Sequence, residues 1–341
     1  MIESWRTHFP AAAALAVVGL VAWAAQLQGA PLGIAPRDHG AFMLWGVLGT
    51  GIQGFLYTAY AKQNDASLPG HRFLFSALAL QVIAALALLL GTGWIALLPW
   101  LIVLGWSIRV AIPSLRRRWD DTTAAVPAVL LSGLVGLLVH SIGGKGTLIG
   151  VTTFVAPLAL AILDRVLPFF SSKVTPGYTG RRLPWFIAPM FVLSWLRVTP
   201  YVTGATILLL ALLGRQWWGW RPWPAARTPM IAILHVGVVW FAIAWILDLS
   251  GAMPSLGLHA LVIGGLGSLL LGISMRVVRG HGGLPLVLGR TGAAVLVLAQ
   301  VAAITRITGG SLLVPAIVLA AAFALWLFRF SPTCIEVDNA R

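Results

Sequence analysis

The chain has 341 residues, of which 59% are hydrophobic and only 9% are charged. A soluble globular protein needs more charged and polar surface, so this composition excludes one and indicates a polytopic membrane protein. The formal net charge of +14 does not indicate nucleic-acid binding, because the basic residues are scattered between apolar runs instead of clustering on one element.

Twelve apolar segments of about spanning length follow one another, separated by Gly, Pro and Arg clusters. The predicted spans are 11–28, 40–61, 72–93, 94–113, 123–142, 147–167, 184–199, 201–215, 229–249, 256–278, 290–307 and 311–329. The first span is interpreted as a helix that is retained, not as a signal peptide. The second span begins soon after it, and the first is needed to complete a topology of twelve helices. The predicted fold is all-α: a polytopic transmembrane helix bundle of about twelve helices, forming a single integral membrane domain over 1–341.

The distribution of Lys and Arg orients this bundle. One side receives nineteen of the 23 basic residues, and the other receives only Arg37, Lys145, Arg197 and Arg306. By the positive-inside rule the more basic side is cytoplasmic, which predicts a multi-pass protein of the cell inner membrane with both termini in the cytoplasm. Residues 331–341 are predicted to be a short polar cytoplasmic tail, and Cys334 an incidental residue within it.

The tenth predicted span carries ionisable side chains along its whole length: His259 near one end, Arg276 in its far half and His281 just beyond it. Such side chains are costly inside a bilayer, so function is their default explanation. His259 and His281 are 22 residues apart. At the helical rise this is roughly 33 Å, about the thickness of the hydrocarbon core. These two histidines therefore face opposite sides of the membrane and cannot share one metal.

The predicted topology sorts the seven histidines into two groups. The periplasmic group is His39, His140 and His259, and the cytoplasmic group is His8, His71, His235 and His281. His39 and His259 lie at similar depth, as bis-histidine ligation of one haem requires. His235 is the deepest. It could ligate with His281 or His71, act alone as a proximal ligand, or be a neutral core histidine.

For the other histidines, the alternatives to metal ligation differ. His39 could be an N-cap or an interfacial residue, His8 is expected to be interfacial, and His71 and His140 are expected to be solvated at helix ends. Arg276 either snorkels to the interface or pairs with a haem propionate through its planar guanidinium.

Two predicted helices share a faint repeat, GxLG[ST]xxxG, over Gly46–Gly54 and Gly264–Gly272. Each copy follows a histidine by five to seven residues, and both helices run from periplasm to cytoplasm. Small residues at this spacing favour close helix packing. A pair of ligand-bearing helices is a second interpretation, compatible with the first.

Neutral imidazole suits haem iron and copper, whereas the lack of clustered Cys and carboxylates argues against zinc and iron–sulfur centres. Groups for a proton route are sparse, which leaves open whether the protein is an enzyme. They are Gln53, Tyr57, Thr58, Tyr60, Asp164 and Asp248.

At these residues the chain resembles the NnrS family. The run from His259 through Gly264-Gly-x-Gly, then Leu-Gly-Ile-Ser-Met-Arg276-Val and Gly280-His281-Gly-Gly, is similar to the family signature. Agreement extends to Asp38-His39-Gly with the later Gly54-Phe-Leu-Tyr-Thr-Ala, to Arg165-Val-Leu-Pro-Phe-Phe-Ser, and to Leu234-His235-Val-Gly. The chain departs from the family at His39, where a double-histidine HxHEM-like motif is usual, and after His281, where a GHTGR-like ending is usual.

The resemblance implies a membrane protein that binds haem b, with copper as a further expected metal, and that handles nitric oxide or protects against nitrosative stress during denitrification. It implies His39, His235, His259 and His281 as metal ligands, with Arg276 as a further cofactor-binding residue. The lipid bilayer, nitric oxide or a related small molecule, and respiratory or denitrification membrane proteins are the implied partners. Two alternatives are a secondary transporter, hinted at by Arg197 between short Pro-flanked helices, and a metal-free scaffold or assembly factor for a respiratory complex.

Overall fold

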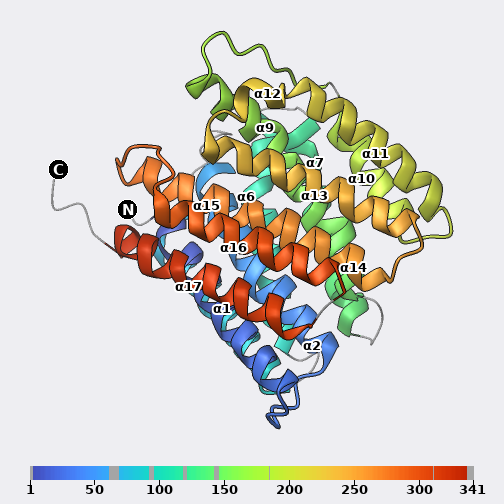
Figure 1. Cartoon of the computed structure of the whole chain (residues 1–341), viewed down its shortest axis with the longest axis vertical. Helices are drawn as coiled ribbons and strands as arrows, with labels where there is room; N and C mark the ends of the chain where they lie inside the picture. The colour runs from blue at the N-terminus through green and yellow to red at the C-terminus, as the bar shows by residue number, and fades with distance from the viewer. Residues whose placement is uncertain are drawn as a thin grey trace.

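A computed structural model describes residues 3–60, 69–91, 96–117, 121–141, 146–183, 185–309 and 311–335, and within them the ordered elements are helices with no strand. The simple helices are α1 (Trp5–Leu27), α5 (His71–Leu89), α6 (Leu98–Arg117), α7 (Asp121–Ser141), α10 (Ile187–Leu196), α11 (Val202–Gly219), α12 (Pro222–Ala225), α13 (Pro229–Leu249), α16 (Arg290–Ile307) and α17 (Leu313–Ile335). They run in a bundle (Figure 1).

Three further helices change winding along their length. The first comprises α2 (Pro36–Ala41), the π-helix η1 (Phe42–Gly49), α3 (Thr50–Phe55) and the π-helix η2 (Leu56–Tyr60). The second comprises α8 (Gly146–Ile149), η4 (Gly150–Val155) and α9 (Ala156–Val174), and the third comprises α14 (Pro254–His259), η5 (Ala260–Gly267) and α15 (Ser268–His281). Segments of π-helix inside α-helices often occur at functional sites.

The predicted helix bundle is confirmed. Each of the twelve predicted spans corresponds to one simple or composite helix, and α12 is an additional short helix. Seven helices among the described residues are long and apolar enough to cross a membrane. The seventh predicted span was too long: α10 has ten residues, because Trp185 before it adopts a left-handed backbone conformation and Pro200 follows soon after it.

Both ends of the described chain lie at the same end of the bundle. Arg6 Nη1 donates to the carbonyl oxygen of Cys334, 3.3 Å away, and His281 Nδ1 lies 3.0 Å from Glu3 Oε2. The start of α1 therefore meets the ends of α15 and α17. Of the basic residues used to orient the bundle, Lys62, Arg118, Lys145 and Arg341 lie outside the described residues.

The predicted tail was too long at its start. Helix α17 continues to Ile335, so residues 331–335 are helical, and the remaining residues of the predicted tail lie outside the described ranges. Cys334 is buried in this last turn, where its thiol lies 3.4 Å from the carbonyl oxygen of Phe330. Pro332 lies inside this helix. Helix α17 packs along α1, and Arg6 of α1 donates to the carbonyl oxygen of Cys334 in this last turn.

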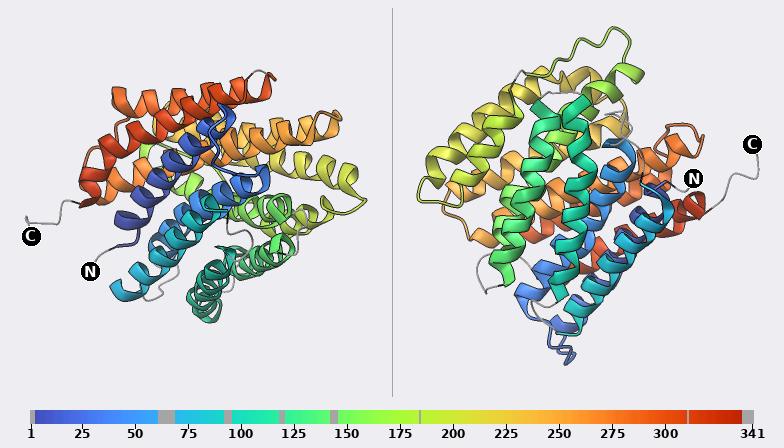
Figure 2. Two further views of the ribbon diagram at one scale, coloured as in Figure 1. Left: turned by 90° about the horizontal axis from the view of Figure 1, so that it is seen from below. Right: turned by 180° about the vertical axis from the view of Figure 1, so that it is seen from behind.

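Helices distant in sequence form the layers of the bundle. Helices α1, α16 and α17 form one face, with α10 and α11 at the opposite edge (Figure 1), whereas α6 and α7 lie on the back (Figure 2). The three composite helices occupy the interior between these layers. Their glycines allow close packing: a Cβ at Gly264 would collide with the Trp240 ring, and one at Gly49 with Trp100.

Candidate functional site

A cavity of about 590 Å³ opens between the N-terminal ends of the composite helices and α1, α16 and α17. Most of its lining is aliphatic or aromatic. Its polar lining side chains are few: Arg37, His39, Thr147, Ser255, His259 and Arg306. Cofactor sites combine a concave apolar volume of about 300–1,000 Å³ with a small number of convergent polar groups. This cavity has both properties.

His39 and His259 both line this cavity, one from α2 and the other from the last residue of α14. Each is only partly exposed. The sequence predicted these two histidines at similar depth, and the structure brings them together.

Neighbouring groups fix both imidazoles. The His39 ring stacks on Trp23 of α1, with centroids 4.4 Å apart and planes inclined by 17°. His259 Nδ1 lies 2.5 Å from the carbonyl oxygen of Ser255. Because a carbonyl oxygen only accepts hydrogen bonds, Nδ1 carries the proton, and Nε2 of the neutral ring is left with a free lone pair. Metal-ligating histidines are held in this way, with the second nitrogen donating to a carbonyl or carboxylate.

Two cations line the same cavity. Arg37 lies beside His39, with its Nε 3.8 Å from Asp38 Oδ1, and Arg306 reaches the cavity from the last turn of α16. Both belong to the small set of basic residues on the predicted periplasmic side. The positive-inside rule disfavours cations there, so their presence at the cavity needs a local reason, and an anionic group on the cavity's occupant is one.

His140 is a neighbour of the cavity that sequence reasoning misjudged. It was expected to be solvated, yet its exposed fraction is 2%. Its Nδ1 lies 3.4 Å from Oγ1 of Thr147, which lines the cavity. Gly146 packs closely against the backbone and Cβ of His140.

His8 was also misjudged. Its interfacial placement is wrong, because the side chain is fully buried, with Nδ1 within 3.2 Å of both Ser4 Oγ and the Ser4 carbonyl oxygen. The ring edge faces Tyr57, with centroids 5.9 Å apart. Gly54 leaves the space for His8, since a Cβ there would press on it.

His235 lies elsewhere in the bundle. It is buried on α13 beside Trp217 of α11, with ring centroids 6.4 Å apart, and it does not line the cavity. Among the described residues, neither of its ring nitrogens has a hydrogen-bond partner. The structure therefore separates His235 from the pair formed by His39 and His259.

His281 and Arg276 are at the other end of the bundle from the cavity. His281 is exposed, beside Glu3 and 5.7 Å from the Trp5 ring, so it lies on the opposite side from His259, as predicted. Arg276 does not snorkel: its exposed fraction is 5%, and its guanidinium lies 4.0 Å from the centre of the Phe170 ring. Neither residue lines the cavity.

The groups considered for a proton route form separate clusters. Tyr57 and Gln53 meet at Ser107, which lies 3.0 Å from the Tyr57 hydroxyl and donates to Gln53 Oε1 at 2.9 Å. Asp164 accepts hydrogen bonds from Arg182 and Gln216, which anchors the segment before α10. In the described ranges, no group of three or more His, Cys, Asp or Glu side chains is placed to hold a metal ion.

Trp23, Arg37, Ser255 and Arg306 are site residues that sequence reasoning did not assign. Arg37 and Arg306 carried a usable signal, since they break the charge bias between the two sides. Trp23 and Ser255 carried none, because their contact with a histidine depends on how the helices pack and wind.

Comparison with known proteins identifies a family. The family model described as "NnrS protein" matches residues 3–337. Searches of curated proteins and of solved structures found no match. The match extends over nearly the whole chain and contains all the cavity residues, so this chain belongs to the NnrS family.

Proposed function

We propose that the 590 Å³ cavity holds a b-type haem, that His39 and His259 are the residues that would hold it, and that the protein uses this centre to bind nitric oxide and protect the cell from it. The observation that carries the proposal is the pair of partly buried imidazoles on one apolar cavity. Family membership supports it.

The residues present fit this group. The Ser255 carbonyl leaves His259 Nε2 free to ligate, and Trp23 holds the plane of the His39 ring. Arg37 and Arg306 are suited to the two propionates, because guanidinium forms bidentate contacts with carboxylates. The apolar lining excludes water and favours a neutral imidazole, the form that binds iron. When bound, the haem would supply an iron atom, and a diatomic gas could bind to that iron only in place of one of the two imidazoles.

The proposed setting is the cell inner membrane, with the cavity toward the periplasm and both termini in the cytoplasm. The charge bias supports this orientation, because nineteen of the 23 basic residues were assigned to the side of the termini. Arg37 and Arg306, two of the four assigned to the other side, line the cavity. Reporter fusions within 282–289 and 250–253 test it. The first should report a cytoplasmic position and the second a periplasmic one.

An optical spectrum and metal analysis of the purified full-length protein test the proposed cofactor. We expect a Soret band with one iron per chain, lost in His39→Ala and in His259→Ala. His71→Ala is the matched control, because His71 is exposed at the start of α5. A colourless wild-type protein, or full Soret absorbance in both cavity variants, would contradict the proposal. The same metal analysis measures copper.

A further inference from the structure

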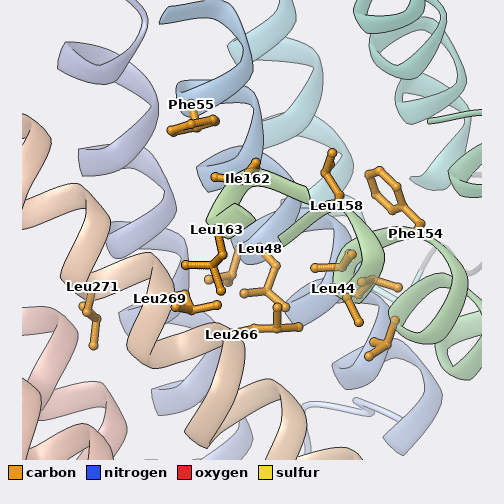
Figure 3. Close-up of a cluster of buried hydrophobic side chains, with 14 of the residues drawn as sticks. Leu44, Leu48, Phe55, Phe154, Leu158, Ile162, Leu163, Leu266, Leu269 and Leu271 are labelled. Carbon is orange, nitrogen blue, oxygen red and sulfur yellow. The ribbon is translucent and has the colours of Figure 1, made fainter. Parts of the chain in front are cut away.

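A second, smaller pocket of about 60 Å³ lies in the bundle interior next to the cavity. Its lining is entirely apolar, and Leu48 belongs to both walls. The lining residues are Phe9, Leu48, Gly51, Ile52, Phe55, Val155, Ala159, Ile162, Leu266, Leu269, Leu270 and Ile273. Figure 3 shows Leu48, Leu266 and Leu269 grouped where the composite helices meet, with Ile162 and Phe55 beyond them.

The lining follows the internal repeat. When the two GxLG motifs are aligned, Leu48, Ile52 and Phe55 correspond to Leu266, Leu270 and Ile273, and both sets line the pocket. These positions have the i, i+4, i+7 spacing of one helix face. The pocket therefore lies between equivalent faces of the two repeat helices.

One position breaks this equivalence. Gly51 corresponds to Leu269, so one repeat contributes a leucine side chain where the other contributes none. A Cβ at Gly51 would collide with Leu270, so this position admits no side chain without a shift. The absence of a side chain at Gly51 lets the Leu270 side chain pack directly against it, so the two repeat faces are not equivalent at the pocket.

Size and chemistry select the occupant. A lipid chain or a cofactor is too large for about 60 Å³, and a water molecule needs two to four polar partners that apolar side chains do not provide. Apolar cavities of this kind stay dry and take up small apolar species such as xenon. We propose that this pocket is a docking site for a small apolar gas on its way to the cavity, with Leu48 as the shared wall. Identification of that gas as nitric oxide rests on the proposed function.

Xenon is the probe, because it needs no haem. Crystals of the full-length protein are pressurised with xenon, and its anomalous scattering locates it. We expect a xenon atom between Leu48, Gly51 and Leu269 in the wild-type protein. An acyl chain in the pocket, or no xenon there, overturns the proposal.

A matched pair of variants sharpens the test. Ala159→Leu adds three carbon atoms to the pocket wall, whereas Ala211→Leu adds the same atoms on an exposed position of α11. We expect loss of the xenon peak in the first and its retention in the second. Equal xenon occupancy in both variants would overturn the assignment.

The test separates the two proposals. Xenon in the pocket together with unchanged haem content in His39→Ala and His259→Ala would support the gas site and contradict the proposed haem ligation. Haem loss in those variants with no xenon in the pocket would support the proposed haem ligation and contradict the gas site.

Discussion

Arg197, directly after α10, forms an ion pair with Asp248 near the end of α13. Arg197 Nε also donates to Thr206 Oγ1 at 3.1 Å, and the guanidinium carbon lies 5.6 Å from the centre of the Trp245 ring. The sequence offered Arg197 as a hint of a transporter. Because the charge is paired and its side chain is only 9% exposed, it joins α10, α11 and α13 instead of lying free at mid-membrane.

Asp248→Asn should destabilise the protein, because it leaves the Arg197 cation without its counter-charge. Removing one partner of a buried pair costs several kcal/mol, and the partial exposure of Asp248 reduces our expectation to about 2 kcal/mol. The double variant Arg197→Met with Asp248→Leu should recover most of this loss. Thermal unfolding of the purified protein measures both. Equal melting temperatures for Asp248→Asn and the wild type would show that the pair contributes nothing.

Gly264→Ala tests the packing role of the repeat. The new methyl group would collide with the Trp240 ring, which is held by a 2.7 Å hydrogen bond from its Nε1 to Gln300. We expect destabilisation of about 1–3 kcal/mol, as for overpacking in a close-packed interior. Gly105→Ala in α6 is the control, since a Cβ there meets no atom within 4 Å. It should be neutral or stabilise the helix by up to about 1 kcal/mol. A similar loss in both variants would rule out the collision as the cause.

Arg37→Gln and Arg306→Gln should each weaken haem retention without abolishing it. Both remove a cation that lines the cavity while leaving the two histidines in place. A charge-assisted hydrogen bond to a carboxylate is worth about 1.5–3 kcal/mol, so the haem dissociation constant should rise by roughly one to two orders of magnitude. Transfer of haem to an apoprotein acceptor measures the change. Wild-type transfer rates in both variants would exclude these arginines as propionate partners.

Arg276→Lys is expected to leave haem content unchanged. Arg276 stacks on Phe170 and lies outside the cavity wall, so its planar guanidinium serves packing in α15 and α9. Lysine should reduce stability by about 1 kcal/mol through loss of the ring contact. Soret absorbance per chain and a melting curve separate the two effects. Haem loss at unchanged stability would restore the cofactor-binding role that the resemblance implied.

His235→Phe should likewise leave the haem of the cavity in place. His235 is buried against Trp217 and does not line the cavity, so a planar apolar ring of similar size replaces it within the same packing. The family resemblance implied His235 as a metal ligand, and this substitution distinguishes that role from a structural one. Loss of the Soret band would indicate a second centre beside Trp217.

Hydropathy, proline and charge were sufficient to predict the helices and which histidines share an end of the bundle. Span length and loop charge are local properties, so His39 and His259 could be paired from sequence. His8 could not be placed, because its burial depends on the space left by Gly54 of another helix. The cavity could not be predicted from the sequence either. It requires the relative rotation of helices far apart in the chain, and no periodic pattern records that rotation.

The π-helical segments η1, η4 and η5 set that rotation. A π-helical turn holds more residues than an α-helical turn, so each segment offsets the angular position of everything on one side of it. Removing a single residue from Phe42–Gly49 would turn His39 by roughly 100° relative to Thr50. The angular positions of side chains in the N-terminal parts of the composite helices are thus set separately from those in the C-terminal parts. Natural insertions or deletions of one residue in these segments would redirect a cavity side chain while leaving the packing of the C-terminal parts intact.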